Sequence, residues 1–385
     1  MAIYLDHAAT SPLRPQVLEA MLPYLREHSG NPSSLHGSGR RARQGVDEAR
    51  EIIAGAIGAQ PREIVFTGSG TEADNLAIKG IAWAGSPRGR HLVTTAVEHK
   101  AVLNSVAILE RSNFDVTVLP VDRSGRVDAL AVAAALTERT TLVSVMAANN
   151  EVGTIQPIAE IGEIVRGHSA KFHVDAIQFA AHAPIDVDAW QADLVSLSAH
   201  KFGGPQGVGA LFVRRGTHML PQLHGGAQER QRRAGTENVA GIVGFGAAFA
   251  LAGAAMAAEA DRLRDLSARL RDGLLALGGV SLSGHDTERL PNNVSVVIES
   301  IEGGDLVAAL DLEGVEVSTG SACTSGSTEP SHVLLAMGIE PELAHGSIRI
   351  TTGPETTDAE VDRALEALRA VLPRLRASRE MVASA

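Results

Sequence analysis

The chain has 385 residues, of which 44% are hydrophobic and 21% charged, the balance of a soluble globular protein large enough for two or more cores. Its formal net charge of −11 produces a field that repels nucleic acid, so direct nucleic-acid binding is not expected. The single cysteine, Cys323, excludes an intrachain disulfide and a multi-cysteine zinc site.

Two segments bear on targeting and membranes. The first seven residues contain no basic n-region and no long apolar h-region, so we expect a cytoplasmic protein that is not exported. Residues 239–258 carry no charge and could cross a membrane by length. They are mostly alanine and glycine, however, and Thr236-Glu237-Asn238 offers a helix-capping start. We therefore expect a helix buried inside the protein, with a membrane span as the alternative.

From about Glu63 to Arg215, short apolar runs alternate with alanine-rich amphipathic stretches. The runs that have the length and composition of strands are residues 64–66, 91–94, 116–119, 142–145, 171–174 and 194–197. This alternation predicts an α/β fold with a mainly parallel sheet covered by helices. Ligands of such sheets bind beyond the carboxyl ends of the strands, so the residues that follow each strand are the first candidates for a site.

The last third of the chain has a different pattern. A charged amphipathic stretch at 257–277 is followed by fewer strands, at 293–298, 315–318 and 347–351, and by a terminal helix near 358–376. This pattern predicts a smaller α+β domain. We assign residues 16–260 to the large domain and residues 1–15 and 261–385 to the small one.

Residues 68–71, Gly-Ser-Gly-Thr, follow the first of these strands and precede a helical stretch. Glycines, hydroxyls and a helix N-terminus together form an anion cradle around Gly70 and Thr71. The Gly-Lys-Ser/Thr ending of an NTPase phosphate loop is absent, as is the dinucleotide pattern G-x-G-x-x-G.

Three further polar residues follow other strands. Asp175 could keep a pyridine nitrogen protonated, or it could be a helix N-cap. The ring of His99 could stack on a flat cofactor, or it could be a structural histidine. Asn150 offers a turn amide, with an ordinary turn as the alternative.

Lys201 directly follows residues 194–200, which alternate between apolar and small polar residues as a strand does. It precedes the glycine-rich turn Phe202-Gly-Gly-Pro205. A lysine at a strand end beside glycines suits a Schiff base with an aldehyde cofactor, although a surface lysine near a turn has the same pattern. The chain has only four lysines, so few amines are available. Together, an anion cradle, a ring, an amide, an aspartate and a lysine form the arrangement that pyridoxal 5′-phosphate (PLP) requires.

Several longer motifs extend this pattern. They include Tyr4-Leu-Asp-His-Ala-Ala-Thr10, Asn31-Pro-Ser-Ser-Leu-His36, Asn149-Asn150-Glu151-Val-Gly153, Ser198-Ala-His-Lys201 and Ser321-Ala-Cys323-Thr-Ser-Gly326. With them the chain resembles, over essentially its whole length, the NifS/IscS-type cysteine desulfurases, which are fold-type-I PLP enzymes similar to class-V aminotransferases. The resemblance implies that the large domain binds PLP and that the small domain carries the catalytic cysteine loop.

The resemblance also assigns roles to single residues. It implies that Lys201 forms the Schiff base, that Asp175 pairs with the pyridine nitrogen and that Gln178 pairs with the phenolate oxygen. His99 stacks on the ring and is a candidate acid and base. The remaining expected cofactor contacts are Gly70, Thr71, Asn150, Ser198, His200 and, from a neighbouring subunit, Thr236. That last contact implies a homodimer.

Substrate chemistry falls to three residues in the same resemblance. Asn150 and Arg349 take the carboxylate of L-cysteine, for which the planar fork of an arginine is well suited. Cys323 lies in a small, polar, glycine-bearing segment, which favours a reactive thiol over a buried spacer. It attacks the substrate sulfur, becomes a persulfide and releases L-alanine.

The persulfide then passes to a sulfur-acceptor protein, such as an iron–sulfur scaffold. Iron would contact the Cys323 persulfide only transiently, and no stable metal site is expected. Selenocysteine lysis and desulfurases dedicated to tRNA thiolation or DNA phosphorothioation stay open as alternatives. An aminotransferase and a non-catalytic sulfur carrier are the more distant alternatives.

Overall fold

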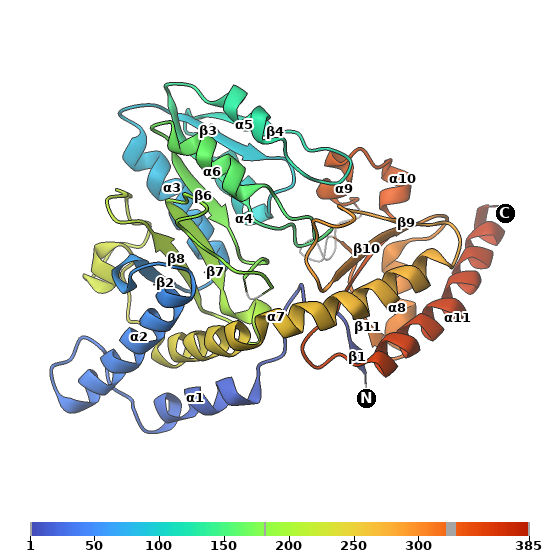
Figure 1. Cartoon of the computed structure of the whole chain (residues 1–385), viewed down its shortest axis with the longest axis horizontal. Coiled ribbons are helices and arrows are strands. Elements are labelled where there is room, and N and C mark those ends of the chain that lie inside the picture. The colour runs from blue at the N-terminus through green and yellow to red at the C-terminus, as the bar shows by residue number, and fades with distance from the viewer. Residues whose placement is uncertain (1, 181, 321–328, 384–385) are drawn as a thin grey trace.

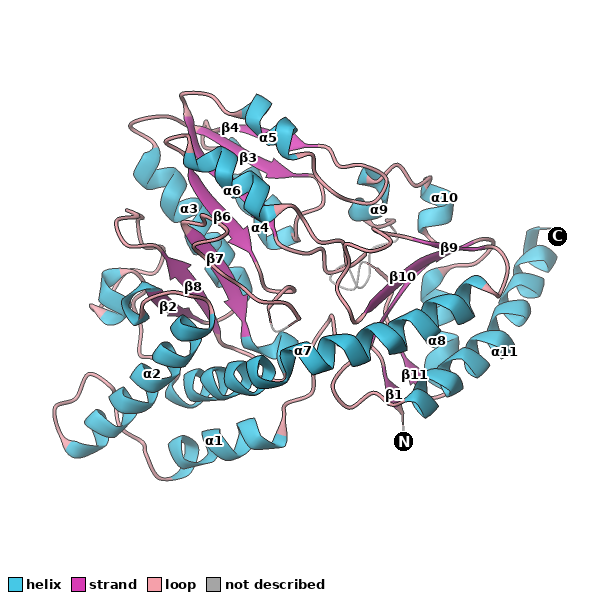
Figure 2. Cartoon of the chain, viewed as in Figure 1, coloured by secondary structure: helices cyan, strands magenta, loops and turns pink. Residues whose placement is uncertain are grey.

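The computed structural model describes residues 2–180, 182–320 and 329–383, with side chains as far as residue 379. Its largest sheet has seven strands (Figure 2). Their order is β2 (Ile64–Thr67), β8 (Gly209–Val213), β7 (Leu194–Ser198), β6 (Lys171–Asp175), β5 (Thr140–Met146), β3 (His91–Thr95) and β4 (Asp115–Leu119). Only β8 runs antiparallel to its neighbours. The predicted α/β fold with a mainly parallel sheet is therefore confirmed.

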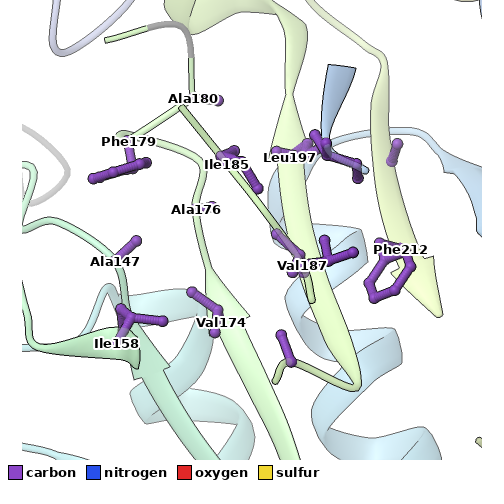
Figure 3. Packing of buried hydrophobic residues seen from close by; sticks show 14 of the residues in the cluster. Ala147, Ile158, Val174, Ala176, Phe179, Ala180, Ile185, Val187, Leu197 and Phe212 are labelled. Carbon is purple, nitrogen blue, oxygen red and sulfur yellow. The ribbon is translucent and has the colours of Figure 1, made fainter. Parts of the chain in front are cut away.

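Strand alternation divides this sheet into two apolar faces. On β7, Val195 and Leu197 enter one core, whereas Leu194 enters the other. The first core is covered by α2 (Gly37–Ala56), α5 (Ala129–Ala135), α6 (Ile158–Arg166) and the first half of α7 (Val239–Leu275). Figure 3 shows its centre, where Val174, Leu197 and Phe212 pack from neighbouring strands. The second core lies under α3 (Gly70–Gly85) and α4 (Lys100–Glu110).

The remaining strands form two small sheets (Figure 1). One is antiparallel, in the order β12 (Ser347–Thr351), β10 (Asn293–Ile298) and β9 (Val280–Leu282). The other pairs β1 (Ile3–Tyr4) in parallel with β11 (Val315–Glu316), which brings the start of the chain beside its last third. The remaining helices are α1 (Pro15–Arg26), α8 (Gly303–Leu312), α9 (His332–Ala336), α10 (Pro341–Ala344), α11 (Asp358–Ala383) and the short 3-10 turns η1 (Pro61–Glu63), η2 (Ala199–Phe202) and η3 (Gln228–Gln231).

Helix α7 joins the two parts of the molecule (Figure 1). It merges the expected segments 239–258 and 257–277 into one helix of 37 residues, and Asn238 caps it as expected by accepting the Gly241 N–H at 3.1 Å. It is the one helix in the described residues that is apolar and long enough to cross a membrane, but half of its most apolar window is buried inside the protein. Core packing therefore accounts for its composition. The domain boundary at residue 260 falls inside this helix and stays a prediction.

Candidate active site

A cavity of about 340 Å³ lies where the carboxyl ends of β5, β6 and β7 meet the start of the chain and β12. Its lining includes ten of the residues that the sequence predicts, which come from the start of α3, from β6, β7, η2 and β12, and from the loops after β3, β5 and β6. They are Gly70, Thr71, His99, Asn150, Asp175, Gln178, Ser198, His200, Lys201 and Arg349. Thr236 is exposed and does not line it. Cys323 lies outside the described residues, but Gly320, which precedes that gap, lines the cavity.

Lys201 is directed into this cavity by η2, which continues β7. The turn closes at Gly203, whose φ of 82° belongs to the left-handed region that favours glycine. The Lys201 Nζ atom donates hydrogen bonds to the carbonyl oxygens of Ala8 at 2.6 Å and Ala9 at 3.1 Å. The amine is therefore held at the cavity wall by the N-terminal segment and is not a solvated surface group.

Asp175, the last residue of β6, is 4% exposed. Its Oδ1 atom accepts the Ile177 N–H at 2.9 Å, a turn bond, and no helix starts at residues 176–180. Burial raises the pKa of Asp175 to about 6, while the Ile177 N–H and the Lys201 ammonium oppose that rise. This carboxyl group is therefore a buried anion close to neutral pH.

His99 caps α4, since its Nδ1 atom accepts the Ala101 N–H at 3.1 Å. Burial first, and then the nearby charges of Lys201, His332 and Lys100, lower the pKa of His99 to about 4. The ring is therefore neutral near pH 7, with its proton on Nε2. His99 is therefore both a structural residue and part of the cavity wall, because its Nδ1 atom caps α4 while the rest of its ring lines the cavity.

The start of α3 forms the opposite corner of the cavity. Ser69 caps the helix by accepting the Glu72 N–H at 3.1 Å. A Cβ atom at Gly70 would lie 2.3 Å from Ile177 Cδ1 and 3.1 Å from Ser198 Cβ, so a larger residue here would force the Ile177 side chain to move. The first N–H groups of a helix have no partner within it and attract anions. This corner is suited to a phosphate group.

Arg349 on β12 is 1% exposed and forms the far wall. Its Nη2 atom donates to Asp6 Oδ1 at 2.7 Å and its Nη1 atom to the Asn150 carbonyl at 3.0 Å. Its Nε atom and the Gln178 Oε1 atom are buried without a hydrogen-bond partner among the described residues. Because buried polar groups are nearly always paired, two such groups in one cavity wall indicate a polar ligand. The residues present therefore fit PLP and a substrate carboxylate.

Comparison with known proteins gives this cavity a family. Residues 3–364 match the family described as "Aminotransferase class-V". The chain belongs to this family. The cysteine desulfurase IscS of Dictyoglomus turgidum is 51% identical over 375 residues, which cover 97% of this chain and 95% of that protein. The family resemblance inferred from the sequence is thereby confirmed.

Solved structures of similar proteins agree with this family. A NifS-like protein matches with a TM-score of 0.93 and 39% identity, over 97% of this chain and all of that one. SspA, solved in complex with cysteine, matches with a TM-score of 0.82 and 37% identity, over 92% of this chain and 99% of that one.

The cavity of this class-V aminotransferase chain also includes residues to which the sequence reading gave no role. Ala8 and Ala9 contribute backbone carbonyls, which no residue pattern marks. Asp6 lies beside them and pairs with Arg349. The motif from Tyr4 to Thr10 marked this segment as part of the resemblance, but it assigned no role to Asp6, Ala8 or Ala9.

Glu151 and His332 also line the cavity and were given no role. Glu151 accepts a hydrogen bond from Ser331, and burial raises its pKa to about 7 despite that bond and the charges of Arg349 and Lys100. His332 Nε2 lies 3.0 Å from the Glu98 carbonyl oxygen, which holds its ring at the cavity. Their positions depend on tertiary packing that no local pattern encodes.

Proposed function

We propose that this chain is a PLP-dependent cysteine desulfurase that converts L-cysteine to L-alanine and forms a persulfide on Cys323. One observation carries the proposal. A lysine amine, a buried aspartate and a buried arginine with an unpaired Nε atom line one cavity, in a chain half identical to a cysteine desulfurase. That convergence provides for a carbonyl cofactor and an amino-acid carboxylate together.

Cofactor binding divides among three elements. The start of α3, with Gly70 and Thr71, would hold the phosphate together with Ser198 and His200. Asp175 would hold the pyridine nitrogen, and the amide N–H group of Gln178 would donate to the phenolate oxygen. When bound through Lys201, PLP supplies an electron sink for the pair left at Cα after proton removal.

Substrate orientation falls to Arg349 and Asn150. The Nε atom of Arg349 is available to a carboxylate, while Asp6 and the Asn150 carbonyl fix the plane of the guanidinium. A side-on pair of charged hydrogen bonds at this fork gives both strength and direction. Asp6 thus orients the arginine without contacting the reacting atoms.

Proton movement at Cα falls to Lys201. Its free amine would be the base that takes the proton from the substrate Cα. The carbonyl oxygens of Ala8 and Ala9 hold the amine at the cavity wall, since they accept hydrogen bonds from its N–H groups. His99, neutral and with Nε2–H, is a candidate donor in the same cavity.

The sulfur step belongs to Cys323 as a thiolate. It attacks the substrate sulfur, so that a sulfur–sulfur bond forms and the substrate carbon–sulfur bond breaks. The electron pair from that bond passes to the substrate Cβ atom, which takes up a proton to become the methyl group of alanine. The balance is one L-cysteine and one protein thiol giving one L-alanine and one protein persulfide.

The persulfide passes to a sulfur-acceptor protein, such as an iron–sulfur scaffold, in the cytoplasm, where thiols stay reduced. We propose a homodimer in which Thr236 reaches the neighbouring subunit's phosphate site. Its support is local. Thr236 is exposed, and shortly before it Glu229, Arg230 and Gln231 have left-handed φ values of 44°, 58° and 65°, a strained backbone that needs support from its surroundings. Light scattering of the purified protein tests the dimer.

Direct assays test the proposed reaction. The PLP-loaded protein is mixed with L-cysteine, and alanine and protein persulfide are quantified in a single turnover. We expect equal amounts of both from the wild type, and bound PLP but no persulfide from Cys323→Ser. Full persulfide formation by Cys323→Ser would overturn the role of this cysteine.

The same assay separates the alternatives. L-selenocysteine in place of L-cysteine tests selenocysteine lysis, and a keto acid with an amino donor tests aminotransfer. A preference for either reaction over cysteine desulfuration would replace the proposed one. Capture of the persulfidated protein with candidate acceptors distinguishes an iron–sulfur scaffold from tRNA-thiolation and DNA-phosphorothioation partners.

A further inference from the structure

A buried row of polar side chains lies beneath Asp175, on the sheet face that α3 covers. Ser144 of β5, His173 and Asp175 of β6, and Ser196 of β7 are paired neighbours across these strands, and each is at most 4% exposed. On the same strands, Leu142 and Leu194 are buried and apolar. The sheet thus changes from apolar to polar toward the cavity.

Helix α3 places a second carboxyl group over this row. Gly70 and Asp74 are one helical turn apart and share a face of α3. A Cβ atom at Gly70 would lie 3.1 Å from Ser198 Cβ, and Asp74 lies one turn deeper, with its Oδ1 atom 3.7 Å from His173 Nε2. His173 Nε2 is itself 2.9 Å from Ser196 Oγ. Asp74 is fully buried, and neither of its carboxyl oxygens has a hydrogen-bond partner among the described residues.

Among the residues that the structure describes, no cation acts on Asp74 to neutralise its ionised form. Both nitrogens of His173 lie 2.9 Å from serine hydroxyls, and burial lowers the pKa of that ring to about 3, so it is neutral. The other charged groups that face Asp74 are the carboxyls of Asp175 and Glu98, and both repel an anion. Burial first, and repulsion by Asp175 second, raise the pKa of Asp74, although the Ser196 hydroxyl opposes this.

The three buried carboxyl groups differ in what stabilises their charge. Glu98 accepts hydrogen bonds from Thr95 Oγ1 at 2.7 Å and the Met146 N–H at 3.0 Å, yet burial raises its pKa to about 8. Asp175 has the Ile177 N–H and the attraction of Lys201. In the part of the chain that the structure describes, Asp74 has no backbone N–H donor and no attraction to a lysine. A proton shared among the three carboxyl groups is therefore held by Asp74 or Glu98 in preference to Asp175.

We propose that Asp74 is a positioning residue that acts through Asp175: it holds a proton and stays uncharged, which leaves Asp175 as the anion facing the pyridine nitrogen. This inference rests on the proposed function for its link to PLP, but the protonation of Asp74 does not depend on that link. Because Asp74 is uncharged, two neighbouring buried carboxylates do not repel each other beside the cofactor site.

The first test uses cofactor-free protein and urea unfolding between pH 5 and pH 8. The folded state holds a proton on Asp74 more tightly than the unfolded chain does, so this group reduces stability progressively as pH rises above about 4. Asp74→Asn removes that loss. We expect the urea midpoint of Asp74→Asn, relative to wild type, to increase steadily with pH.

A matched control is Asp122→Asn, the same change at a surface turn. Partial burial of Asp122 acts to raise its pKa, but the hydrogen bonds from Ser124 and the Arg126 N–H outweigh it and lower the pKa. Because this carboxyl group is ionised in both the folded and the unfolded state above about pH 5, the midpoint of this variant relative to wild type should stay constant between pH 5 and pH 8. Asp74→Ser is a second uncharged variant. A midpoint difference for Asp74→Asn that is constant or falls with pH overturns the proposal, as does failure of both neutral variants to fold at pH 7.

The second test measures PLP affinity by fluorescence titration. At pH 7 Asp74→Asn should bind PLP within about twofold of wild type, because it matches the uncharged state, whereas Asp175→Asn should bind at least about tenfold more weakly. A loss for Asp74→Asn as large as that for Asp175→Asn overturns the proposal. A normal affinity for Asp175→Asn contradicts the proposed cofactor placement instead, and leaves the stability test to decide on Asp74.

Discussion

The two walls of the cavity are built in different ways. The sheet wall consists of Asp175, His99 and Lys201, which lie at or after the ends of strands of one mainly parallel sheet. The N-terminal wall consists of Ala8 and Ala9 with their carbonyls and of Arg349 from β12, which Asp6 binds from outside the lining. The sheet wall places reactive groups through local strand geometry, whereas the N-terminal wall orients them through contacts between distant parts of the chain. The difference predicts that the sheet wall controls the chemical step and the N-terminal wall controls substrate binding.

Lys201→Ala should have the largest effect, because it removes the cofactor link and the base together. We expect the rate of alanine formation to fall by roughly 10⁴-fold, the upper range for a lost general base. Single-turnover alanine assays and the absorbance of bound PLP measure it. The matched control is Lys171→Ala. Lys171 is the first residue of β6, and its amine binds Asp193 away from the cavity. Activity of Lys201→Ala within tenfold of the control would contradict the assignment.

Arg349→Lys keeps the charge and removes the fork. The loss of one charged hydrogen bond, worth about 1.5–3 kcal/mol, should raise KM for L-cysteine by roughly 10- to 100-fold and change kcat much less. Steady-state kinetics separates the two constants. Arg264→Lys, on an exposed ion pair with Asp261, is the control. A fall in kcat without a rise in KM would show that this wall takes part in the chemistry.

Asp6→Asn should have a smaller effect of the same kind. Asparagine keeps an oxygen for Arg349 Nη2 but loses the charge, so KM should rise roughly 3- to 10-fold with kcat unchanged, as for a weakened hydrogen bond of about 0.5–1.5 kcal/mol. Asp261→Asn is the control on the surface. An unchanged KM would mean that Arg349 is held in place without Asp6.

The last effect concerns stability and not activity. His173 is buried and neutral, because burial lowers its pKa to about 3. As pH falls below about 6.5, this histidine is protonated in the unfolded chain but not in the folded state, which stabilises the unfolded chain. Stability should therefore fall by roughly 2 kcal/mol between pH 6.5 and pH 5 from this group. Urea unfolding of His173→Gln should show a shallower acid loss than wild type. Parallel acid profiles for the two proteins would exclude a neutral His173.

The sequence could predict most of the sheet wall because each strand ends in a recognisable apolar run. Residues 293–298 and 347–351 were also predicted at the bounds of β10 and β12. The short strands β1 and β9 were missed, since two or three residues carry no usable periodicity.

The N-terminal wall could not be predicted in the same way. The Arg349–Asp6 pair joins residues 343 positions apart, and backbone carbonyls carry no residue signature. Asp74 has a further difficulty, because a polar residue in a helical stretch normally faces solvent, and only packing shows that this one does not.

Helix α7 has one more consequence. Ile242, Phe245 and Phe249 anchor its first half in the large core, and Leu263 and Leu270 anchor its second half in the small one. At 1.5 Å per residue it is a rod of about 55 Å, and residues 253–258 between its anchors are mostly exposed. A protease that cuts there would place Lys201 and Asp175 on one fragment and Arg349 on the other, so that after a single nick the cavity would be held together by non-covalent contacts such as the β1–β11 pairing and the Arg349–Asp6 ion pair.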